Sequence, residues 1–332
     1  MPTRIVSDPT PDTTRDVAAL LRVIGRGSRG SRDLNHTQAR WLMQHMLRGQ
    51  VGDAQLGAAL MALRLKGETV EELSGFLQAV EADLPTLRTS RPVVVVASVN
   101  GGRKLTNQLP LLCMLLRQRR IATLVIGQEH DDGRAHTAAL WTAVDLPRAH
   151  TTREAEAMLQ ADEPVYIDLR VLSPGLAALM DLRRVLGVRS AAHTLVKLLA
   201  PVAAPSLLLG GYTHGEYGPL MQELLDARGR TALLLHGCEG EAVPHPSRRT
   251  ELLWTHLPPG TKAPAALPPA AETDTGLPPF DADLESSRAW SRGVLEGTLA
   301  APTALTRFVD IISDAVLALD APTPPPIEEP ST

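Results

Sequence analysis

The sequence predicts an α/β protein in which an N-terminal helical bundle precedes an α/β domain with a mainly parallel sheet. Apolar residues recur at helical spacing over the first 84 residues, and after Pro85 the pattern changes to short β-branched runs. These runs alternate with helical stretches, as in proteins with parallel sheets. The 332 residues are enough for two domains. We expect a helical domain over 1–88, an α/β domain over 89–320 and an acidic, Pro-rich tail over 321–332.

Four helices are expected in the N-terminal domain, because each apolar repeat follows a residue that can cap a helix. The cap candidates are Thr13 or Thr14, then Asn35, Asp53 and Thr69. Thr69 and Glu72 also have the spacing of a capping box.

The second domain opens with a β-branched run, Val93 to Ala97, which has the composition of a buried strand. Further strands are expected at 122–126, 165–167, 206–209 and 231–236. Helices are expected from Pro110 onward and at 135–144, 174–186, 191–199 and 218–226. Residues 257–280 are rich in Pro and Ala and indicate an extended excursion or linker.

Composition narrows the class of protein. Hydrophobic residues make up 44% of the chain and charged residues 21%, which is typical of a globular protein, and no apolar run is long enough to cross a bilayer. The two cysteines, Cys113 and Cys238, offer no disulfide framework. We therefore expect a cytoplasmic protein with no membrane partner.

Charge is unevenly distributed along the chain. The net charge is −4, but residues 272–332 hold eleven acidic residues and three arginines. The first 271 residues are left with 30 basic and 26 acidic side chains, and all but four of the basic ones are arginine. An arginine fork can bind phosphate in a bidentate manner, although an excess of arginine over lysine also follows from genome composition alone.

Several segments resemble anthranilate phosphoribosyltransferase and its relatives, the class-III glycosyltransferase superfamily, over most of residues 15–245. In the helical part they are Gly52–Ala58 and Leu63–Thr69, and further along the chain they are Leu186–Arg189, His193–Pro201 and His236–Gly240. The resemblance implies a helical domain joined to an α/β domain, with part of 175–200 packed back onto the helical domain.

The chain departs from that family at its catalytic motifs. The family's first glycine loop reads GTGGD and cradles pyrophosphate, whereas this chain has Val99-Asn100-Gly101-Gly102-Arg103, followed by Lys104. The family's Asn-x-Ser-Thr corresponds to Asn107-Gln108-Leu109-Pro110, without the hydroxyls. Its KHGNR loop has lost both basic ends around Gly127, and the magnesium-binding Asp-Glu pair is reduced to Glu241. Phosphoribosyl transfer needs metal charge to stabilise the departing pyrophosphate, so the parent reaction is not expected here.

The replaced segments are similar to the YbiB-type branch of the superfamily. The similarity is carried by Ser98–Lys104, Ile24–Gly27 and Gly187–Leu195. It implies a homodimer, assembled through the helical part, that binds nucleic acid with little sequence preference and lacks the transferase activity.

Three groups of residues are candidates for contact with phosphate or nucleic acid. The Gly-rich segment 25–32 carries Arg26, Arg29 and Arg32. It is either a loop that contacts phosphate or a solvated loop between two helices. The glycine pair segment follows an expected strand, at the edge where open α/β sheets bind ligands. Its candidates are Asn100, Gly101, Gly102, Arg103 and Lys104.

The third group has the spacing of one helical face. Arg189, His193 and Lys197 lie four residues apart, so that a continuous helix would place them together. Such a face would either contact nucleic acid or pair with nearby acidic residues.

We therefore predict non-specific binding of DNA or RNA through phosphate contacts, with no catalytic residue, metal site or cofactor. The alternative is a divergent phosphoribosyltransferase, which the retained Gly101-Gly102 pair leaves open. Aromatic residues make up only 3% of the chain, which argues against an extensive platform for stacking single-stranded bases.

Overall fold

The computed structural model describes residues 16–27, 29–128, 134–269, 277–279 and 283–320. Its contacts divide the chain into two units. One holds the chain up to Leu84 together with Leu172–Val196, and the other holds Pro85–Val171 and the chain from Lys197 onward. The division is therefore not the contiguous one expected at residue 88. The return of the 172–196 segment to the helical unit agrees with what the family resemblance implied.

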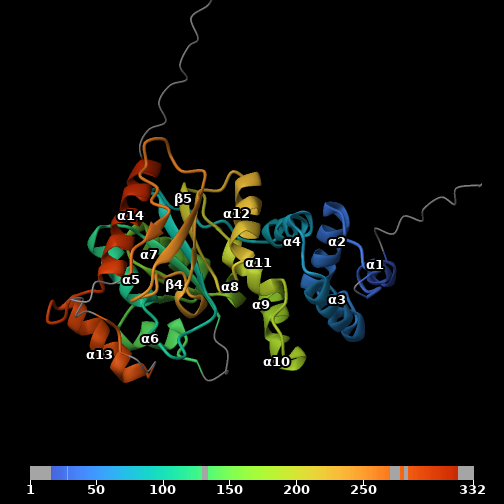
Figure 1. Cartoon of the computed structure of the whole chain (residues 1–332), viewed down its shortest axis with the longest axis horizontal. Coiled ribbons are helices and arrows are strands. Elements are labelled where there is room, and N and C mark those ends of the chain that lie inside the picture. The colour runs from blue at the N-terminus through green and yellow to red at the C-terminus, as the bar shows by residue number, and fades with distance from the viewer. Residues whose placement is uncertain (1–15, 28, 129–133, 270–276, 280–282, 321–332) are drawn as a thin grey trace, which may run out of the picture. The chain divides into compact units, whose positions relative to one another are not determined.

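The helical unit begins with the four expected helices (Figure 1): α1 (Val17–Ile24), α2 (His36–Leu47), α3 (Asp53–Lys66) and α4 (Val70–Ala82). Its returning segment adds α9 (Pro174–Asp181), α10 (Arg183–Leu186) and α11 (Ala192–Leu195) after the short α8 (Leu169–Leu172). Helix α9 packs on α2 and α11 packs on α4, which is why the returning segment belongs to this unit.

Two of the cap predictions are confirmed and two are corrected. Asn35 caps α2 and Thr69 caps α4, each within a complete capping box. Helix α1 is capped by Asp16, and Thr13 and Thr14 lie outside the described residues. Asp53 is the first residue of α3 rather than its cap, because the preceding Gly52 takes the cap position.

One buried ion pair joins three parts of the helical unit. The Glu72 side chain is completely buried, and its oxygens accept hydrogen bonds from the Leu34 N–H at 2.9 Å and from Lys66 Nζ at 2.7 Å. Lys66 also contacts Asp33 at 2.7 Å. Burial alone would lower the pKa of Lys66, but its bonds to Asp33 and Glu72 outweigh that effect and hold the pKa above its ordinary value.

The α/β unit contains an eight-stranded sheet in the order β3-β4-β2-β1-β5-β6-β7-β8. The strands as far as β6 run parallel, and β7 and β8 are antiparallel additions. This confirms the mainly parallel sheet. Their bounds are β1 Val93–Ser98, β2 Thr123–Gly127, β3 Arg148–Ala149, β4 Val165–Asp168, β5 Ser206–Tyr212, β6 Ala232–His236, β7 Thr250–Thr255 and β8 Ala266–Leu267.

Helices cover this sheet (Figure 1), with α5, α13 and α14 on one side and α12 on the other. Their bounds are α5 Leu109–Gln118, α6 Thr137–Ala143, α7 Thr152–Gln160, α12 Tyr217–Ala227, α13 Leu284–Leu295 and α14 Thr303–Asp320. The sequence analysis did not assign β3, α7, α8, β7, β8, α13 or α14.

Helix α14 shows that residues 303–320, part of the acidic 272–332 segment, belong to the packed α/β unit. Leu305, Phe308 and Ile312 are fully buried and belong to the hydrophobic core of the α/β unit. The acidic residues Asp310 and Asp314 lie on the outer face of that helix. The expected tail at 321–332 lies outside the described residues.

Among the described residues, no helix combines the length and the apolar character that crossing a membrane requires. Cys113 and Cys238 are both free thiols and both buried. Burial raises the pKa of both thiols, that of Cys238 to about 12.

Candidate functional site

The glycine loop, residues 99–104, follows β1 at the centre of the sheet. The chain passes from β1 to β2 on one side and later returns to β5 on the other, so the carboxyl ends of β1 and β5 form a topological switch point. Open α/β sheets bind ligands at such a point. The loop therefore lies where the sequence placed it and where a ligand site is expected.

Glu241 occupies the first half of the glycine loop. Its side chain is buried, and its Oε1 accepts hydrogen bonds from the Asn100 N–H at 2.9 Å and the Gly101 N–H at 2.7 Å. Its Oε2 accepts a bond from the Ser98 hydroxyl at 2.6 Å. A carboxylate thus sits where backbone N–H groups converge, which is the arrangement that binds anions in other glycine nests.

The second half of the loop is closed by Glu239 and by the backbone. Glu239 accepts hydrogen bonds from the N–H groups of Arg103 and Lys104, the latter at 2.8 Å. The Gly102 N–H donates to the Ala135 carbonyl at 2.9 Å. Every backbone N–H from residue 100 to residue 104 is therefore paired with an acceptor of the chain itself.

The turn that supplies both glutamates depends on close backbone approach. Gly240 has a φ of +93°, and Glu239 itself has a φ of +53°. A Cβ atom on Gly237 would come within 2.0 Å of the Glu241 carbonyl oxygen, and one on Gly211 within 2.9 Å of the Gly240 carbonyl oxygen. Asn100 adds a side-chain bond to that Gly240 oxygen at 2.6 Å. The 237–241 turn is thus fixed against the glycine loop by contacts that larger residues would prevent.

Both polar atoms of the Asn107 side chain are engaged in hydrogen bonds within the chain. Its Nδ2 donates to the Thr137 hydroxyl at 2.6 Å, and its Oδ1 accepts from the Leu109 N–H at 3.0 Å. The residue that the resemblance aligned with a phosphate- and metal-contacting position is therefore used to hold the start of α5.

Two candidate cations extend from the closed loop. The Arg103 and Lys104 side chains are exposed, and neither forms a hydrogen bond or ion pair within the described part of the chain. Their backbone N–H groups are held by Glu239, so the loop is ordered while both charges face solvent.

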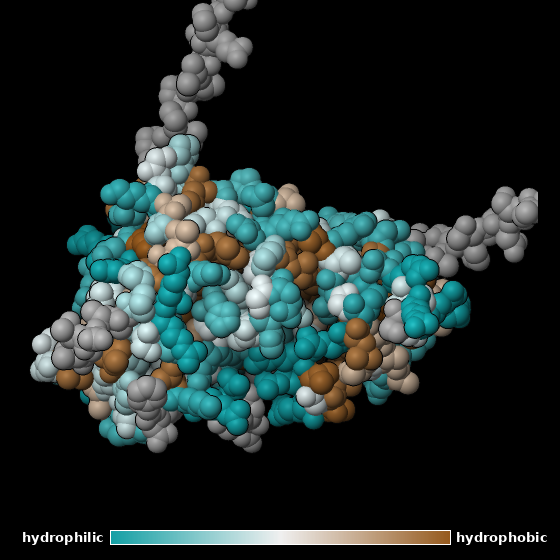
Figure 2. All heavy atoms as spheres, in the orientation of Figure 1, coloured by the Kyte–Doolittle hydropathy of each residue, from teal (hydrophilic) through white to brown (hydrophobic). Residues whose placement is uncertain are grey.

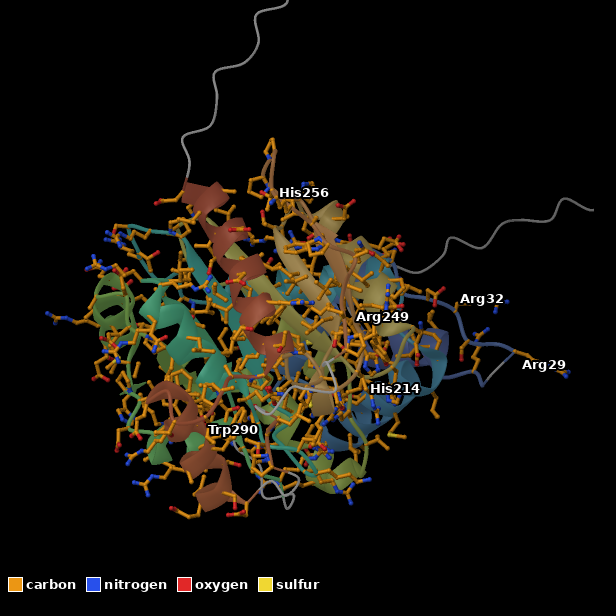
Figure 3. The ribbon with its side chains drawn as sticks, turned by 60° about the vertical axis from the view of Figure 1, so that its left-hand side comes forward. Arg29, Arg32, His214, Arg249, His256 and Trp290 are labelled. Carbon is orange, nitrogen blue, oxygen red and sulfur yellow. The ribbon has the colours of Figure 1, made fainter. Side chains whose placement is uncertain are left out.

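The basic loop of the helical unit has a similar character (Figure 3). Its backbone turns at Gly27, whose φ is +77°, and Ser31 and Arg32 donate back to the Gly27 and Val23 carbonyls at 3.0 Å each. Arg26, Arg29 and Arg32 are all exposed, and Arg29 lies at the outer tip of the loop. The loop is a folded turn that presents three arginines to solvent.

The third predicted group does not form one helical face. Gly187 ends α10 with a φ of +73°, so Arg189 lies outside any helix. His193 is buried, with its Nδ1 accepting from the Ser190 N–H at 3.3 Å. Lys197 is buried in the α/β unit, where its Nζ donates to the Gly211 carbonyl at 2.6 Å. The regular spacing was misleading because the helix is interrupted, and His193 and Lys197 serve the interior instead.

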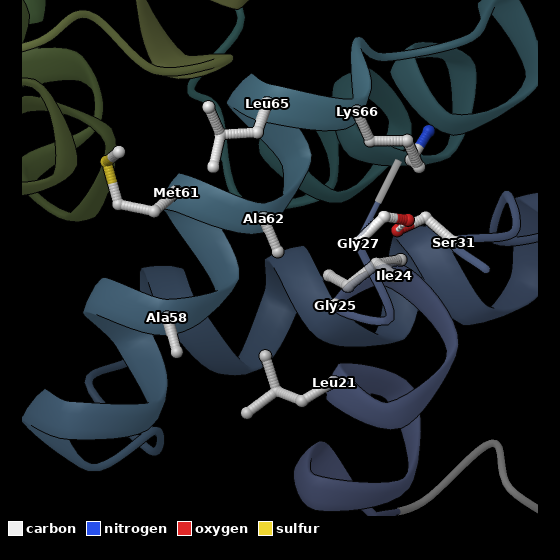
Figure 4. Close-up of a pocket in the computed structure, with 10 residues that line it drawn as sticks. All are labelled: Leu21, Ile24, Gly25, Gly27, Ser31, Ala58, Met61, Ala62, Leu65 and Lys66. Atoms are coloured by element: carbon white, nitrogen blue, oxygen red, sulfur yellow. Dashed lines mark hydrogen bonds between the residues drawn. The ribbon is translucent and has the colours of Figure 1, made fainter. Parts of the chain in front are cut away.

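The helical unit also exposes apolar surface (Figure 2), which gathers over α3 and α10. Leu65 is 81% exposed and Val185 80% exposed. Beside them a hollow of about 790 Å³ lies between α1 and α3 (Figure 4). It is lined mainly by Leu21, Ile24, Ala58, Met61, Ala62 and Leu65.

The described residues contain no group of three or more His, Cys, Asp or Glu side chains placed to hold a metal ion. Glu241, the acid that the resemblance placed at the magnesium site, is committed to the glycine loop. The sequence analysis missed this role and that of Glu239. The available signal was two glutamates around a glycine in the Gly237-Cys238-Glu239-Gly240-Glu241 turn.

Known proteins resemble the chain in both sequence and fold. Residues 19–82 match the helical bundle domain of the glycosyl transferase family. Escherichia coli YbiB is 35% identical over 239 residues, which are 70% of this chain and 74% of YbiB. Anthranilate phosphoribosyltransferase 2 of Ralstonia nicotianae is 28% identical over 67% of this chain, and the match spans 64% of that enzyme.

Solved structures agree with this placement of the fold. Anthranilate phosphoribosyltransferase from Thermus thermophilus superposes with a TM-score of 0.66 and 22% identity, covering 87% of this chain and 94% of that one. The Saccharomyces cerevisiae enzyme, in complex with PRPP and Mg, gives a TM-score of 0.67 at 14% identity, covering 91% of this chain and 85% of that one. Together with the identity to YbiB, these comparisons show that the chain belongs to the YbiB-type branch of the anthranilate phosphoribosyltransferase-like superfamily.

Proposed function

We propose that this protein binds DNA or RNA non-specifically through phosphate contacts and does not transfer phosphoribosyl groups. One observation carries the proposal: the glycine loop is closed by Glu239 and Glu241, while the Arg103 and Lys104 side chains beside it are exposed and unpaired in the described part of the chain. The same loop that lacks free N–H groups for pyrophosphate thus offers two cations to another anion.

The closed loop argues against the parent reaction on electrostatic grounds. A pyrophosphate brought to this loop would meet two carboxylates at the N–H groups it needs, and like charges at such distances repel. Displacing Glu241 would also leave a buried carboxylate without its donors, which is costly.

Phosphate contact is supported by the arginines of the helical unit. Arg26 and Arg29 form no hydrogen bond or ion pair through their side chains among the described residues, and glycines on either side leave room for a nucleic-acid backbone. Each phosphate that such a cation neutralises releases a counterion, so affinity depends on salt.

The proposal includes a homodimer assembled through the helical unit, in which the hollow between α1 and α3 receives a second copy. Apolar side chains exposed to the extent of Leu65 favour an interface. Leu65→Asp is expected to shift the protein from dimer to monomer in sedimentation velocity, and a monomeric wild type would exclude this part of the proposal. The proposal also includes a cytoplasmic location, with which the two free, buried cysteine thiols are compatible.

The test is to measure the affinity of the protein for a labelled duplex of about 20 base pairs by fluorescence anisotropy across a salt series. The logarithm of affinity is expected to fall linearly with the logarithm of salt, with a slope of about −0.9 for each phosphate contacted. Arg103→Ala/Lys104→Ala is expected to make that slope shallower by about two. Arg91→Ala is the matched control, because Arg91 is an exposed arginine already paired with Asp162 at 3.0 Å.

Failure of the wild type to bind at low salt would exclude the proposal. The divergent phosphoribosyltransferase is the second candidate, because the fold matches that of an enzyme solved with PRPP and Mg. A rise in melting temperature of the wild type with phosphoribosyl pyrophosphate and Mg²⁺ would favour it, since a ligand of the native state stabilises that state.

A further inference from the structure

A second hollow in the α/β unit lies apart from the glycine loop. It has a volume of about 330 Å³ and is formed where β5 and β6 end and β7 begins, against the start of α12. We call it the β5–β7 pocket. Its lining residues are Tyr212, Gly215, Pro219, His236, Arg249, Glu251 and Leu253.

The strand register creates the aromatic wall of this pocket. Tyr212 and His236 are partners at the carboxyl ends of β5 and β6, and their rings meet edge to face with centroids 5.7 Å apart. His236 Nε2 lies 3.0 Å from the Thr213 carbonyl oxygen, which fixes the orientation of its ring. The Tyr212 ring is seated against Gly218, where a Cβ would come within 2.7 Å of it. The wall is therefore preformed, with His236 exposed and Tyr212 buried behind it.

The opposite side of the pocket carries one charge of each sign. Arg249 immediately precedes β7 and is labelled in Figure 3, and Glu251 and Leu253 follow at alternate positions of the strand. Arg249 and Glu251 are exposed, and neither forms an ion pair or side-chain hydrogen bond within the described ranges. Burial, together with the proximity of Glu251, raises the pKa of the Tyr212 hydroxyl, which keeps that hydroxyl neutral.

These groups define the ligand by its chemistry. The ring of His236 with Pro219 and Leu253 suits a flat, largely apolar ring. The Glu251 carboxylate only accepts hydrogen bonds, so the ring must present donors to it. Arg249 suits an attached anion, above all a phosphate. A nucleotide unites all three features, and the volume is at the lower end of the range for small-ligand sites.

We propose that the β5–β7 pocket receives one base of a single-stranded nucleic acid, with the base against His236, its donor edge at Glu251 and its phosphate at Arg249. Guanine fits best, because its N1–H and exocyclic amine present two adjacent donors to one carboxylate. The inference rests on the proposed nucleic-acid function and refines it. The few aromatic residues of the chain do not form a long platform, but Tyr212 and His236 form one site.

The consequence is a preference for single strands that phosphate contacts alone do not give. In a duplex the donor edge of guanine is paired and the base is stacked, so the pocket stays unused. Stacking of one base on an aromatic side chain corresponds to roughly fivefold or more in affinity.

The experiment compares a labelled single-stranded 20-mer containing guanine, the same oligomer with inosine in place of guanine, and the corresponding guanine duplex, all at one salt concentration. Inosine keeps N1–H and lacks the exocyclic amine. The wild type is expected to bind the guanine single strand about fivefold or more tightly than the duplex and more tightly than the inosine strand. Glu251→Gln and His236→Ala are expected to remove most of that preference while leaving duplex affinity unchanged. Glu223→Ala, an exposed glutamate on α12, is the matched control.

A second measurement separates this inference from the proposed function. Guanosine monophosphate is titrated into wild type and Glu251→Gln while the melting temperature is recorded. Stabilisation of the wild type alone supports the pocket even if no oligonucleotide binds. Binding of single strand and duplex with equal affinity, unchanged in both variants, would overturn the pocket and leave the phosphate-contact function standing. Absence of any oligonucleotide binding at low salt would instead refute the proposed function.

Discussion

Replacing Glu241 with alanine tests whether the chain fills its own anion site. The substitution removes the acceptor of three buried donors: the Ser98 hydroxyl and the N–H groups of Asn100 and Gly101. Each unsatisfied buried donor costs about 1–3 kcal/mol, and water entering the space offsets part of the loss. We expect the free energy of unfolding to fall by roughly 3–5 kcal/mol. Urea unfolding at neutral pH measures it, with Glu223→Ala expected to change it by less than about 0.5 kcal/mol.

The same variant is expected to regain affinity for anions. With the carboxylate gone, the Asn100 and Gly101 N–H groups can bind an oxygen of inorganic pyrophosphate. A ligand at 100 times its Kd stabilises the native state by about 2.7 kcal/mol. Pyrophosphate should therefore recover much of the stability lost in Glu241→Ala, relative to potassium chloride of equal ionic strength, and Glu239→Ala should respond in the same direction.

Two results would refute this reasoning. If Glu241→Ala is as stable as Glu223→Ala, the three hydrogen bonds do not hold the loop. If pyrophosphate stabilises the wild type as much as it stabilises the variants, the loop is open to anions despite its glutamates, and the phosphoribosyltransferase alternative gains the advantage.

Four further expectations concern the rest of the fold. Glu72→Ala should lower the free energy of unfolding by about 3–5 kcal/mol in urea, because it leaves the Leu34 N–H without its acceptor and the largely buried Lys66 with only the exposed Asp33 as its ionic partner; a loss below 1 kcal/mol would contradict this. Phe308→Ala should cost about 3–5 kcal/mol, since that ring is fully buried beneath α14, whereas a removable C-terminal segment would tolerate the change. Burial and Arg248 lower the pKa of His245 from 6.5, so its neutral form stabilises the native state above pH 6.5 and that contribution is lost as the pH falls; His245→Asn should flatten the stability profile between pH 7 and 5. The Cys238 thiol, with a pKa of about 12, should not react with Ellman's reagent at pH 8 until the protein unfolds.

Local signals predicted local structure well. The capping boxes at Asn35 and Thr69 need only residues three positions apart, and both are present. The strands β1, β2 and β6 were predicted from short apolar runs, because a strand that is buried on both faces consists almost entirely of apolar residues. The same reasoning failed for α14, where acidic composition obscured an apolar face that is complete from Leu305 to Val316.

The candidate site depended on information that spacing does not carry. Glu241 is 140 residues from Gly101 along the chain, and no sequence pattern in either segment predicts that the two are in contact. The 189–197 spacing was read as one helical face, but the rule holds only within a continuous helix, and Gly187 ends the helix before Arg189. Arg103 and Lys104 were named as candidates for phosphate contact, and the structure shows that both side chains are exposed; their contact with phosphate stays a prediction.

The closed glycine loop satisfies its own backbone donors and leaves two cationic side chains exposed beside it. A loop of converging N–H groups needs a negative partner, and in a phosphate-binding protein the ligand supplies it. Here the Glu239 and Glu241 side chains accept the hydrogen bonds of the loop, so its N–H groups are satisfied without any ligand. Because the backbone donors are satisfied internally, the Arg103 and Lys104 side chains need not balance a bound pyrophosphate and remain available to other anions. The same pair of carboxylates thus satisfies the loop and leaves both cations exposed, which is why we expect variants of Glu239 and Glu241 to alter anion binding and nucleic-acid binding together.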